Sequence, residues 1–368
     1  MPLSMPFVKP GDIPEEKKEE ESSMVKTVCS LLVLVFLVFA SLPAAMAYAD
    51  IQPKAADLVK DGQLIDLTSL RYQGLFKELR LRNNFSQEEI DRLFAGVTIK
   101  QRVLELMDTQ WEAKPYYLYY PLFITPEVVA EGREKLAVNR ELLDKIEKEI
   151  GVAREIVVAI WGVETRYGQH KGAFNLFQTL NTMFDAYPRR SNFYREQLVH
   201  FLLLCKENHI DPLTVTGSYG GAFGQTQFIP SSFRDYAVDF DLDGSRDVWN
   251  STPDVLASIA NYLHRFGWVF HAPIYHEIGP VLKSETLEKA YKTGRKGFVS
   301  VAEVAQAQGV TMPPAPENKE VTIVGLELED GGMRYVAGYP NFQAITAWNN
   351  SNRYAMAVVE LAEKLSGK

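Results

Sequence analysis

One carboxyl group in this sequence lies at the end of an apolar helical segment, where it has the properties of an acid catalyst. Within residues 154–168, Ile156, Ile160 and Glu164 recur every four positions, so a helix places them on one face. Burial beside aliphatic side chains disfavours the charged carboxylate and raises its pKa, which suits general acid catalysis near neutral pH. The alternative is an ion pair between Glu164 and a neighbouring arginine.

A glycine-rich segment, residues 217–232 (GSYGGAFGQTQFIPSS), combines groups that are typical of sugar-binding sites. Its glycines allow close backbone approach to a ligand. Sugars present hydroxyls at their edges and C–H groups on their faces, which match neutral polar side chains and aromatic rings. The segment supplies both kinds of group, in Ser218, Gln225 and Gln227 and in Tyr219 and Phe228. Without Glu164 nearby, it is equally compatible with a tight turn.

Alternating acidic residues after position 238 follow the register of an EF-hand calcium loop. The candidate ligands are Asp239, Asp241, Asp243, Ser245 and Asn250. Asn250 occupies the position that normally carries a bidentate Glu, so one charge and one ligand oxygen are lost. We therefore expect a structural Ca²⁺ site with a dissociation constant of about 10⁻⁴ to 10⁻³ M. The alternative is an Asx-rich turn without a metal.

The elements that position these residues are mostly helices. Ser86 and Glu89 form a capping-box pattern, and Thr125 followed by Pro126 begins a helix expected to run toward Ile150. Further helices are predicted after Ser191, from Thr252, and from about Ser351 to Leu365. Cys205 lies on the apolar stripe of the helix that follows Ser191, so we interpret it as a core thiol.

The composition changes between about residues 272 and 340. TMPPAPEN is typical of a loop, KEVTIVGLEL alternates like a strand, and EDGG is typical of a hairpin turn. The predicted fold class is therefore mostly α, of α+β type, in three parts. These are a helical domain at 50–271, a small α+β insert at 272–340, and a segment at 341–368 that returns to the helical domain.

The first 49 residues are predicted to be a leader. Residues 24–49 have the layout of a secretory signal peptide, with Lys26, the apolar stretch Leu31–Ala40, and small residues around Ala47. An uncleaved N-terminal anchor is the alternative. With 39 basic and 47 acidic side chains, the chain has a formal charge of -8. That charge argues against a general nucleic-acid binder, because phosphate contact needs a basic face.

Six ordered segments carry a resemblance to a known family. They are WGVETRYG, YPRR (187–190), GSYGGAFGQTQFIPSSF, VDFDLDGSRDVW, ANYL followed by FGW, and ITAWNNS. Across nearly all of the mature chain, the sequence resembles the lytic murein transglycosylase B family, enzymes that cleave the glycan strands of peptidoglycan. The resemblance implies a lysozyme-like helical catalytic core that contains the EF-hand-like loop.

The resemblance also assigns roles to single residues. Glu164 matches the catalytic acid and base, and the substrate-binding matches are Tyr119, Arg189, Arg190, Ser218, Gln227, Phe228, Tyr262 and Asn349. Two departures affect the subsites. Ala347-Trp348 stands where Arg-Tyr is frequent, and Tyr219-Gly220 stands where Trp-Ala is common.

The implied reaction cleaves the β-1,4 bond between N-acetylmuramic acid and N-acetylglucosamine and leaves 1,6-anhydromuramoyl ends. The resemblance implies that Glu164 acts as acid and then as base. Neither cleft motif contains a second carboxylate, but Asp185 could come close to Glu164 in the fold. No cofactor is expected for the chemistry. We expect an exported, periplasmic monomer that acts on glycan strands and also meets other cell-wall enzymes. The alternatives are a catalytically silent peptidoglycan-binding scaffold and a hydrolytic muramidase.

Overall fold

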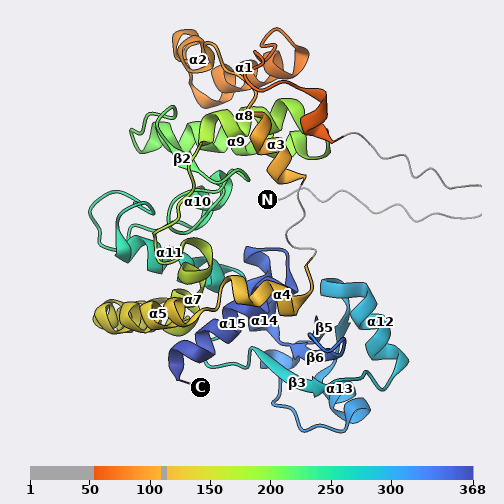
Figure 1. The fold of residues 1–368 in the computed structure, drawn as a ribbon. Helices are drawn as coiled ribbons and strands as arrows, with labels where there is room; N and C mark the ends of the chain where they lie inside the picture. Colours follow the sequence, from red (N-terminus) through yellow and green to blue (C-terminus); the bar gives the residue numbers. More distant parts are fainter. Residues whose placement is uncertain (1–53, 109–113, 368) are drawn as a thin grey trace, which may run out of the picture. The chain divides into compact units, whose positions relative to one another are not determined.

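The computed structural model describes residues 54–108 and 114–367, all of them within the compact unit that begins at Gln52. The predicted leader at 1–49 lies outside these residues. Most of the described chain is helical, which confirms the predicted fold class (Figure 1). Among the helices of the described residues, none combines the length and the apolar character needed to cross a membrane.

One group of helices packs around α8 and α9. It comprises α1 (Leu70–Asn83), α2 (Gln87–Phe94), α3 (Gln101–Met107), α8 (Leu176–Ala186) and α9 (Ser191–Glu207). The capping box predicted at the start of α2 is present, with the Ser86 hydroxyl accepting from the Glu89 amide. Cys205 is buried in α9, and burial raises the pKa of its thiol to about 12, as expected for a core thiol.

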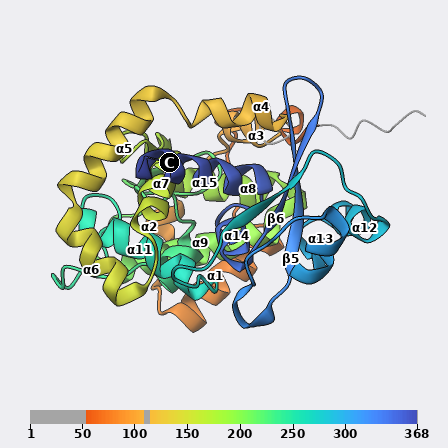
Figure 2. The same ribbon diagram turned by 90° about the horizontal axis from the view of Figure 1, so that it is seen from below.

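A second group of helices surrounds α7 (Arg154–Thr165). It comprises α5 (Pro126–Val138), α6 (Arg140–Ile150), α11 (Thr252–Arg265), α14 (Pro340–Trp348) and α15 (Asn352–Ser366). Helix α7 contacts α5, α11 and α15, and the short α10 (Pro230–Tyr236) contacts both α9 and α11 (Figures 1 and 2). All side chains from Ile156 to Ile160 are buried, so the apolar helix predicted from the sequence lies in the core.

The single helix predicted from Thr125 to Ile150 is instead two helices, α5 and α6. The Thr125 hydroxyl caps α5 as predicted, at 3.3 Å from the Val128 amide nitrogen. The chain leaves helical geometry at Asn139, whose side-chain amide donates to the Lys135 carbonyl oxygen at 2.9 Å. The Asn139 backbone amide also donates to the Lys135 carbonyl oxygen, at 3.1 Å, so the side chain adds a second bond at the end of α5.

A small antiparallel sheet occupies much of the predicted insert. Its strands are β3 (Tyr275–Gly279), β4 (Phe298–Val299), β5 (Val321–Glu327) and β6 (Met333–Gly338), in the order β3-β6-β5-β4. The predicted hairpin joins β5 to β6. Helices α12 (Glu285–Thr293) and α13 (Val301–Gln308) complete this part, and residues between Ile278 and Tyr339 form an apolar cluster of their own (Figure 2).

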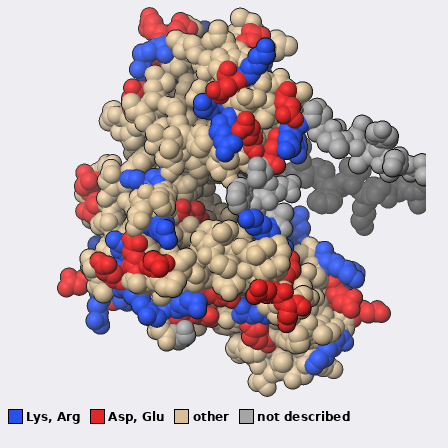
Figure 3. Space-filling model, in the orientation of Figure 1, with Lys and Arg blue, Asp and Glu red and all other residues tan. Residues whose placement is uncertain are grey.

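The remaining elements are short. They are α4 (Tyr116–Tyr119), β1 (Phe174–Asn175), β2 (Thr216–Gly217), and the 3-10 turns Ala55–Leu58, Tyr120–Leu122, Pro188–Arg190, Gly294–Lys296 and Pro316–Asn318. Strands β1 and β2 pair with each other, and β2 ends at Gly217, the first residue of the glycine-rich segment. On the face drawn in Figure 3, acidic and basic side chains are interspersed, which agrees with the composition-based argument against a general nucleic-acid binder.

Candidate active site

The catalytic candidate Glu164 lies in the last turn of the buried helix α7. Helix α7 ends at Thr165 because Arg166 and Tyr167 adopt left-handed conformations, with φ of 51° and 58°. Gly168 follows with φ of 90°, and a Cβ there would lie only 2.3 Å from Gln225 Oε1. A glycine is therefore required where the chain leaves α7 and contacts the glycine-rich segment.

The Glu164 carboxyl group, near the end of α7, forms hydrogen bonds with residues of the last two helices, α14 and α15. The Tyr354 hydroxyl donates to Glu164 Oε1 at 2.5 Å, and Trp348 supplies a second hydrogen bond. Burial nevertheless dominates and raises the pKa of Glu164 to about 7, while these two hydrogen bonds lower it. The direction agrees with the sequence-based expectation. Arg154 pairs instead with Asp144 and Glu147, so it does not neutralise Glu164.

Three aromatic rings, Phe228, Tyr262 and Trp348, pack together beside Glu164, and we call them the ring cluster. The ring centroids of Phe228 and Trp348 are 5.1 Å apart, and those of Tyr262 and Trp348 are 4.6 Å apart. The Tyr262 hydroxyl donates to the Ala347 carbonyl oxygen at 2.8 Å. Tyr119 and Tyr262 both contribute to the raised pKa of Tyr354, so they lie close to its hydroxyl.

The glycine-rich segment is fastened to α7 by one glutamine. Trp161 Nε1 donates to Gln225 Oε1 at 2.9 Å, and Gln225 Nε2 donates to the Trp249 carbonyl oxygen at 2.9 Å. Gln227 donates to the Gly224 and Lys171 carbonyl oxygens at 3.0 and 3.3 Å. These bonds hold the segment against the helix that carries Glu164, which brings together the two motifs predicted to form the site.

Ser218 lies in the same segment and stabilises its turn. Its hydroxyl oxygen accepts from the Ala222 amide at 3.1 Å. Phe228 is almost fully buried, at 2% exposure, so within the ring cluster it contributes packing and little exposed surface. Asn349 follows α14 directly, next to Trp348.

The two predicted cleft arginines are not gathered around Glu164. Arg189 pairs with Asp108 at 3.0 Å, and the Arg190 guanidinium lies 4.3 Å from the centre of the Phe193 ring. Within residues 54–108 and 114–367, neither arginine forms a hydrogen bond, ion pair or ring contact with Glu164 or the ring cluster. Both are exposed and lie between α8 and α9, where a long substrate could reach them.

Two contacts of Glu164 were missed by the sequence-based prediction. Tyr354 was read only as part of the last helix, and Trp348 only as a substitution for a tyrosine. Nothing local in the sequence links Tyr354 to Glu164, which is 190 positions earlier. The one available indication was that the late ITAWNNS motif directly precedes this helix.

The acidic loop folds back on itself through backbone hydrogen bonds. Asp239 accepts from the Asp243 and Gly244 amides at 3.1 and 2.9 Å. Carboxylate oxygens of Asp239, Asp241 and Asp254 lie within 4.8 Å of one another. Asp254 is therefore a candidate ligand that the sequence-based register missed, while Asn250 donates its side-chain amide to Asp247.

Comparison with known proteins identifies the family of this chain. The family "Transglycosylase SLT domain" matches residues 71–363. The sequence is 31% identical to membrane-bound lytic murein transglycosylase B of Escherichia coli K12, over 77% of this chain and 80% of that protein. The chain therefore belongs to the transglycosylase SLT domain family, and it is a lytic murein transglycosylase as predicted.

Comparison with solved structures also identifies lytic transglycosylases. Soluble lytic transglycosylase SltB1 of Pseudomonas aeruginosa matches with a TM-score of 0.71 and 35% identity, covering 80% of this chain and 97% of that chain. The Escherichia coli lytic transglycosylase Slt35, solved with calcium, has a TM-score of 0.71 at 30% identity, covering 84% and 96%. Pseudomonas aeruginosa SltB3, solved with NAG-NAM-pentapeptide, has a TM-score of 0.69 at 33% identity, covering 81% and 79%.

Proposed function

We propose that the protein cleaves the β-1,4 bond between N-acetylmuramic acid and N-acetylglucosamine, with Glu164 acting first as acid and then as base. The observation that carries this proposal is the raised pKa of Glu164, about 7, beside the ring cluster and the glycine-rich segment. A carboxyl group with this pKa is substantially protonated near neutral pH and can donate its proton. Once it has done so, the hydrogen bonds from Tyr354 and Trp348 stabilise the resulting carboxylate.

In the proposed reaction, Glu164 protonates the glycosidic oxygen and the bond to C1 of the muramoyl residue breaks. The substrate's own N-acetyl group steadies the positive charge at C1, as in substrate-assisted glycosidases. The Glu164 carboxylate then takes the proton of the C6 hydroxyl while that oxygen attacks C1. A 1,6-anhydro ring closes, Glu164 regains its proton, and no water is consumed.

A one-carboxylate mechanism is supported by the surroundings of Glu164. Glycosidases that use two carboxylates hold them on either side of the scissile bond. Among the described residues, no second carboxylate contributes to the pKa of Glu164. Asp185, the other carboxylate that we considered as a candidate, lies near Arg71 and Asp66, whose charges act on its pKa.

The proposal predicts a specific product. Digestion of purified sacculi should release muropeptides that are lighter by one water than hydrolytic products, because the C6 hydroxyl replaces water as the nucleophile. Mass spectrometry of the released fragments checks this prediction. Products with reducing ends would indicate a muramidase, and no release at all would indicate a catalytically silent scaffold.

We further propose that the remaining predicted residues form the glycan-binding cleft, with the two arginines farther from the scissile bond than the others. They are Tyr119, Arg189, Arg190, Ser218, Gln227, Phe228, Tyr262 and Asn349. The bound NAG-NAM-pentapeptide in the related SltB3 supports a peptidoglycan ligand. A periplasmic location after removal of residues 1–49, a monomeric state, and the three-part division at residues 271 and 340 remain part of the same proposal.

We also propose a structural calcium site in the acidic loop. The calcium complex of the related Slt35 supports it, as does the convergence of three carboxylates in this chain. Carboxylate oxygens are the ligands that Ca²⁺ prefers. Asp239, Asp241 and Asp254 would hold the ion, with Asp243, Ser245 and Asn250 as the further candidates from the loop register. The ion would stabilise the loop and take no part in proton transfer.

Calcium should therefore raise the melting temperature. A ligand at 10 to 100 times its dissociation constant adds roughly 1.4 to 2.7 kcal/mol to the stability. For a domain of this size, that corresponds to an increase of roughly 2 to 4 °C in 10 mM CaCl₂ over EGTA. Asp254→Asn should abolish the increase, whereas Asp57→Asn, at an exposed position in another part of the fold, should keep it. An equal increase in Asp254→Asn would contradict the site.

A further inference from the structure

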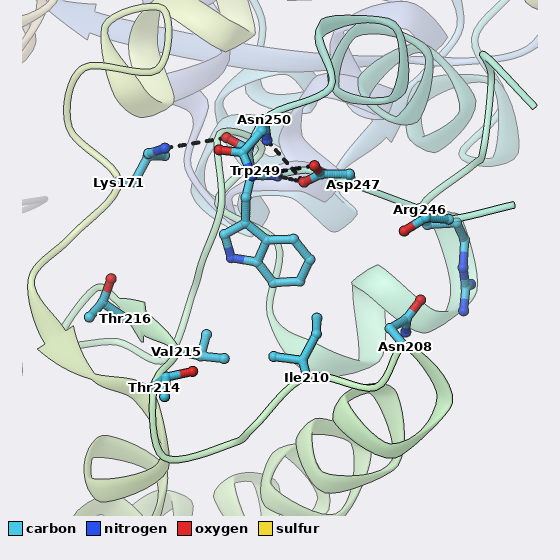
Figure 4. Close-up of a pocket in the computed structure, with 11 residues that line it drawn as sticks. Lys171, Asn208, Ile210, Thr214, Val215, Thr216, Arg246, Asp247, Trp249 and Asn250 are labelled. Atoms are coloured by element: carbon cyan, nitrogen blue, oxygen red, sulfur yellow. Dashed lines mark hydrogen bonds between the residues drawn. The ribbon is translucent and has the colours of Figure 1, made fainter. Parts of the chain in front are cut away.

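A cavity of about 490 Å³ lies beside the acidic loop (Figure 4). Its walls come from four places: the segment between α7 and β1, the segment that follows α9, strand β2 with the residues just before it, and the acidic loop with Trp249. We call it the Trp249 pocket, and its lining includes Lys171, Ile210, Val215, Thr216, Trp249 and Asn250. None of the residues proposed to bind the scissile sugar lines it. Its volume lies in the range of small-molecule sites, roughly 300 to 1,000 Å³.

Trp249 provides a fixed aromatic surface in this pocket. Its indole stacks on the Phe223 ring, with centroids 5.2 Å apart and an interplanar angle of 19°. The residue is nevertheless partly exposed, and Figure 4 shows the indole directed into the cavity, toward Ile210 and Val215. Because one side of the ring is held by Phe223, a ligand can stack on the pocket side without losing much side-chain freedom on binding.

The polar groups around the indole both donate and accept. Lys171 Nζ donates to the Trp249 carbonyl oxygen at 3.3 Å, and an ammonium group has two further N–H donors. Asn208 uses its amide nitrogen on the Leu204 carbonyl oxygen at 2.7 Å, so its own side-chain oxygen can accept from a ligand. The Thr216 hydroxyl, on an exposed residue, can do either.

The charges of the pocket are mostly satisfied internally. Asp247 accepts from the Trp249 and Asn250 amides at 2.8 and 2.9 Å, so its carboxylate stabilises the acidic loop. Arg246 donates to the Arg234 carbonyl oxygen at 3.2 Å and lies over the Phe233 ring. Lys171, whose ammonium group keeps two N–H donors beyond its bond to Trp249, is the remaining cation of the lining. One cation among neutral polar groups suits a ligand with at most one carboxylate.

We propose that the Trp249 pocket binds a pyranose ring of an N-acetylated glycan, as a second saccharide site outside the catalytic cleft. The inference rests on the proposed function, because that function supplies a polymer of such sugars. The C–H face of a pyranose would stack on Trp249, and its hydroxyls would exchange hydrogen bonds with Lys171, Thr216 and Asn208. A muramoyl carboxylate would pair with Lys171. An acidic peptide, which carries several carboxylates, would lack matching cations.

The pocket shares structural parts with the catalytic cleft. Gln225 joins the Trp249 carbonyl oxygen to Trp161 of α7, and the Lys171 carbonyl oxygen accepts from Gln227. Thr216 is only two positions before Ser218. A glycan held at the pocket is thus anchored to the same segment that forms the cleft, which should raise the affinity for long strands without changing the chemistry.

The test uses tryptophan as a reporter of both sites. In Glu164→Gln labelled with 5-fluorotryptophan, Trp348 reports on the cleft and Trp249 on the pocket, and each ¹⁹F resonance is assigned by its Phe variant. On titration with tetra-N-acetylchitotetraose, both resonances should shift. Adding Thr216→Arg, which places a long side chain in the pocket, should abolish the Trp249 shift and keep the Trp348 shift. Thr311→Arg, on an exposed residue elsewhere, is the matched control.

The outcomes separate the two proposals. A Trp249 resonance that stays fixed while Trp348 shifts overturns the second site alone, and so does a Trp249 shift that persists in Thr216→Arg. A Trp249 response to the free stem tetrapeptide, without a response to chitotetraose, overturns the sugar assignment. In otherwise wild-type protein, Thr216→Arg should slow digestion of sacculi several-fold with an unchanged melting temperature, and should leave turnover of a short soluble glycan unchanged. Absence of sacculus digestion by the wild type would instead contradict the proposed function.

Discussion

Replacing Glu164 with Gln should lower the rate of glycan cleavage by about 10² to 10⁴-fold, the usual contribution of general acid–base catalysis. Gln has nearly the same shape but cannot donate a proton to the glycosidic oxygen. The measurement is the initial rate of muropeptide release from sacculi. Glu155→Gln makes the same chemical change in the first turn of the same helix and should retain full activity. Full muropeptide release by Glu164→Gln would rule out this residue as the acid.

The same variant should be more stable than the wild type at high pH. The folded-state pKa of Glu164, about 7, lies above the ordinary value of 4.5, so the folded protein holds this proton more tightly. The wild type therefore loses stability as the pH rises from about 4.5 to about 7, by roughly 3 kcal/mol at most. Replacing Glu164 with Gln removes this pH-dependent loss of stability, because Gln does not titrate. Thermal unfolding should show a larger gain for Glu164→Gln at pH 8 than at pH 4.5, and an equal gain at both would contradict the assigned pKa.

Replacing Tyr354 with Phe should reduce kcat/KM by about 10 to 100-fold, since hydrogen bonds to charged groups contribute roughly 1.5 to 3 kcal/mol. The Tyr354 hydroxyl donates to Glu164 at 2.5 Å and lowers the pKa of its carboxyl group. Without this bond the pKa of Glu164 rises further above 7. The acid form then persists to higher pH, so the alkaline limb of the pH–rate profile should move to higher pH.

This profile distinguishes a positioning role from a merely structural one. Tyr72→Phe also removes a buried hydroxyl with a partner, Asn181 Oδ1 at 3.0 Å, in a different group of helices. Tyr72→Phe should lower the free energy of unfolding by a comparable amount and leave both the cleavage rate and the pH–rate profile unchanged. An unshifted alkaline limb in Tyr354→Phe would show that the hydroxyl does not act on Glu164.

Local patterns predicted much of the fold. The caps at Ser86 and Thr125, the last helix after Ser351, and the hairpin between β5 and β6 were predicted because each depends on residues close together in the sequence. The break at Asn139 was missed because the charged, leucine-containing pattern continues through it, and the backbone leaves helical angles at this single residue. The strand order β3-β6-β5-β4 depends on contacts that no local pattern encodes.

The site was predictable only in part, for a similar reason. The position of Glu164 on an apolar helix indicates a raised pKa, and the structure agrees in direction. Its hydrogen-bond partner Tyr354 is supplied by a distant helix and had no detectable signature. Asp254 falls in the helix predicted from Thr252 and was not among the predicted metal ligands, whereas the fold places it against Asp239 and Asp241.

The contact between α7 and α15 has a consequence for how the site can be impaired by proteolysis. The hydroxyl that bonds Glu164 belongs to a helix 190 positions later in the chain. Cleavage just before residue 352 would separate this helix from the rest of the chain without touching Glu164. Such a cut should therefore weaken proton donation through loss of the Tyr354 hydroxyl, although the acid itself is intact.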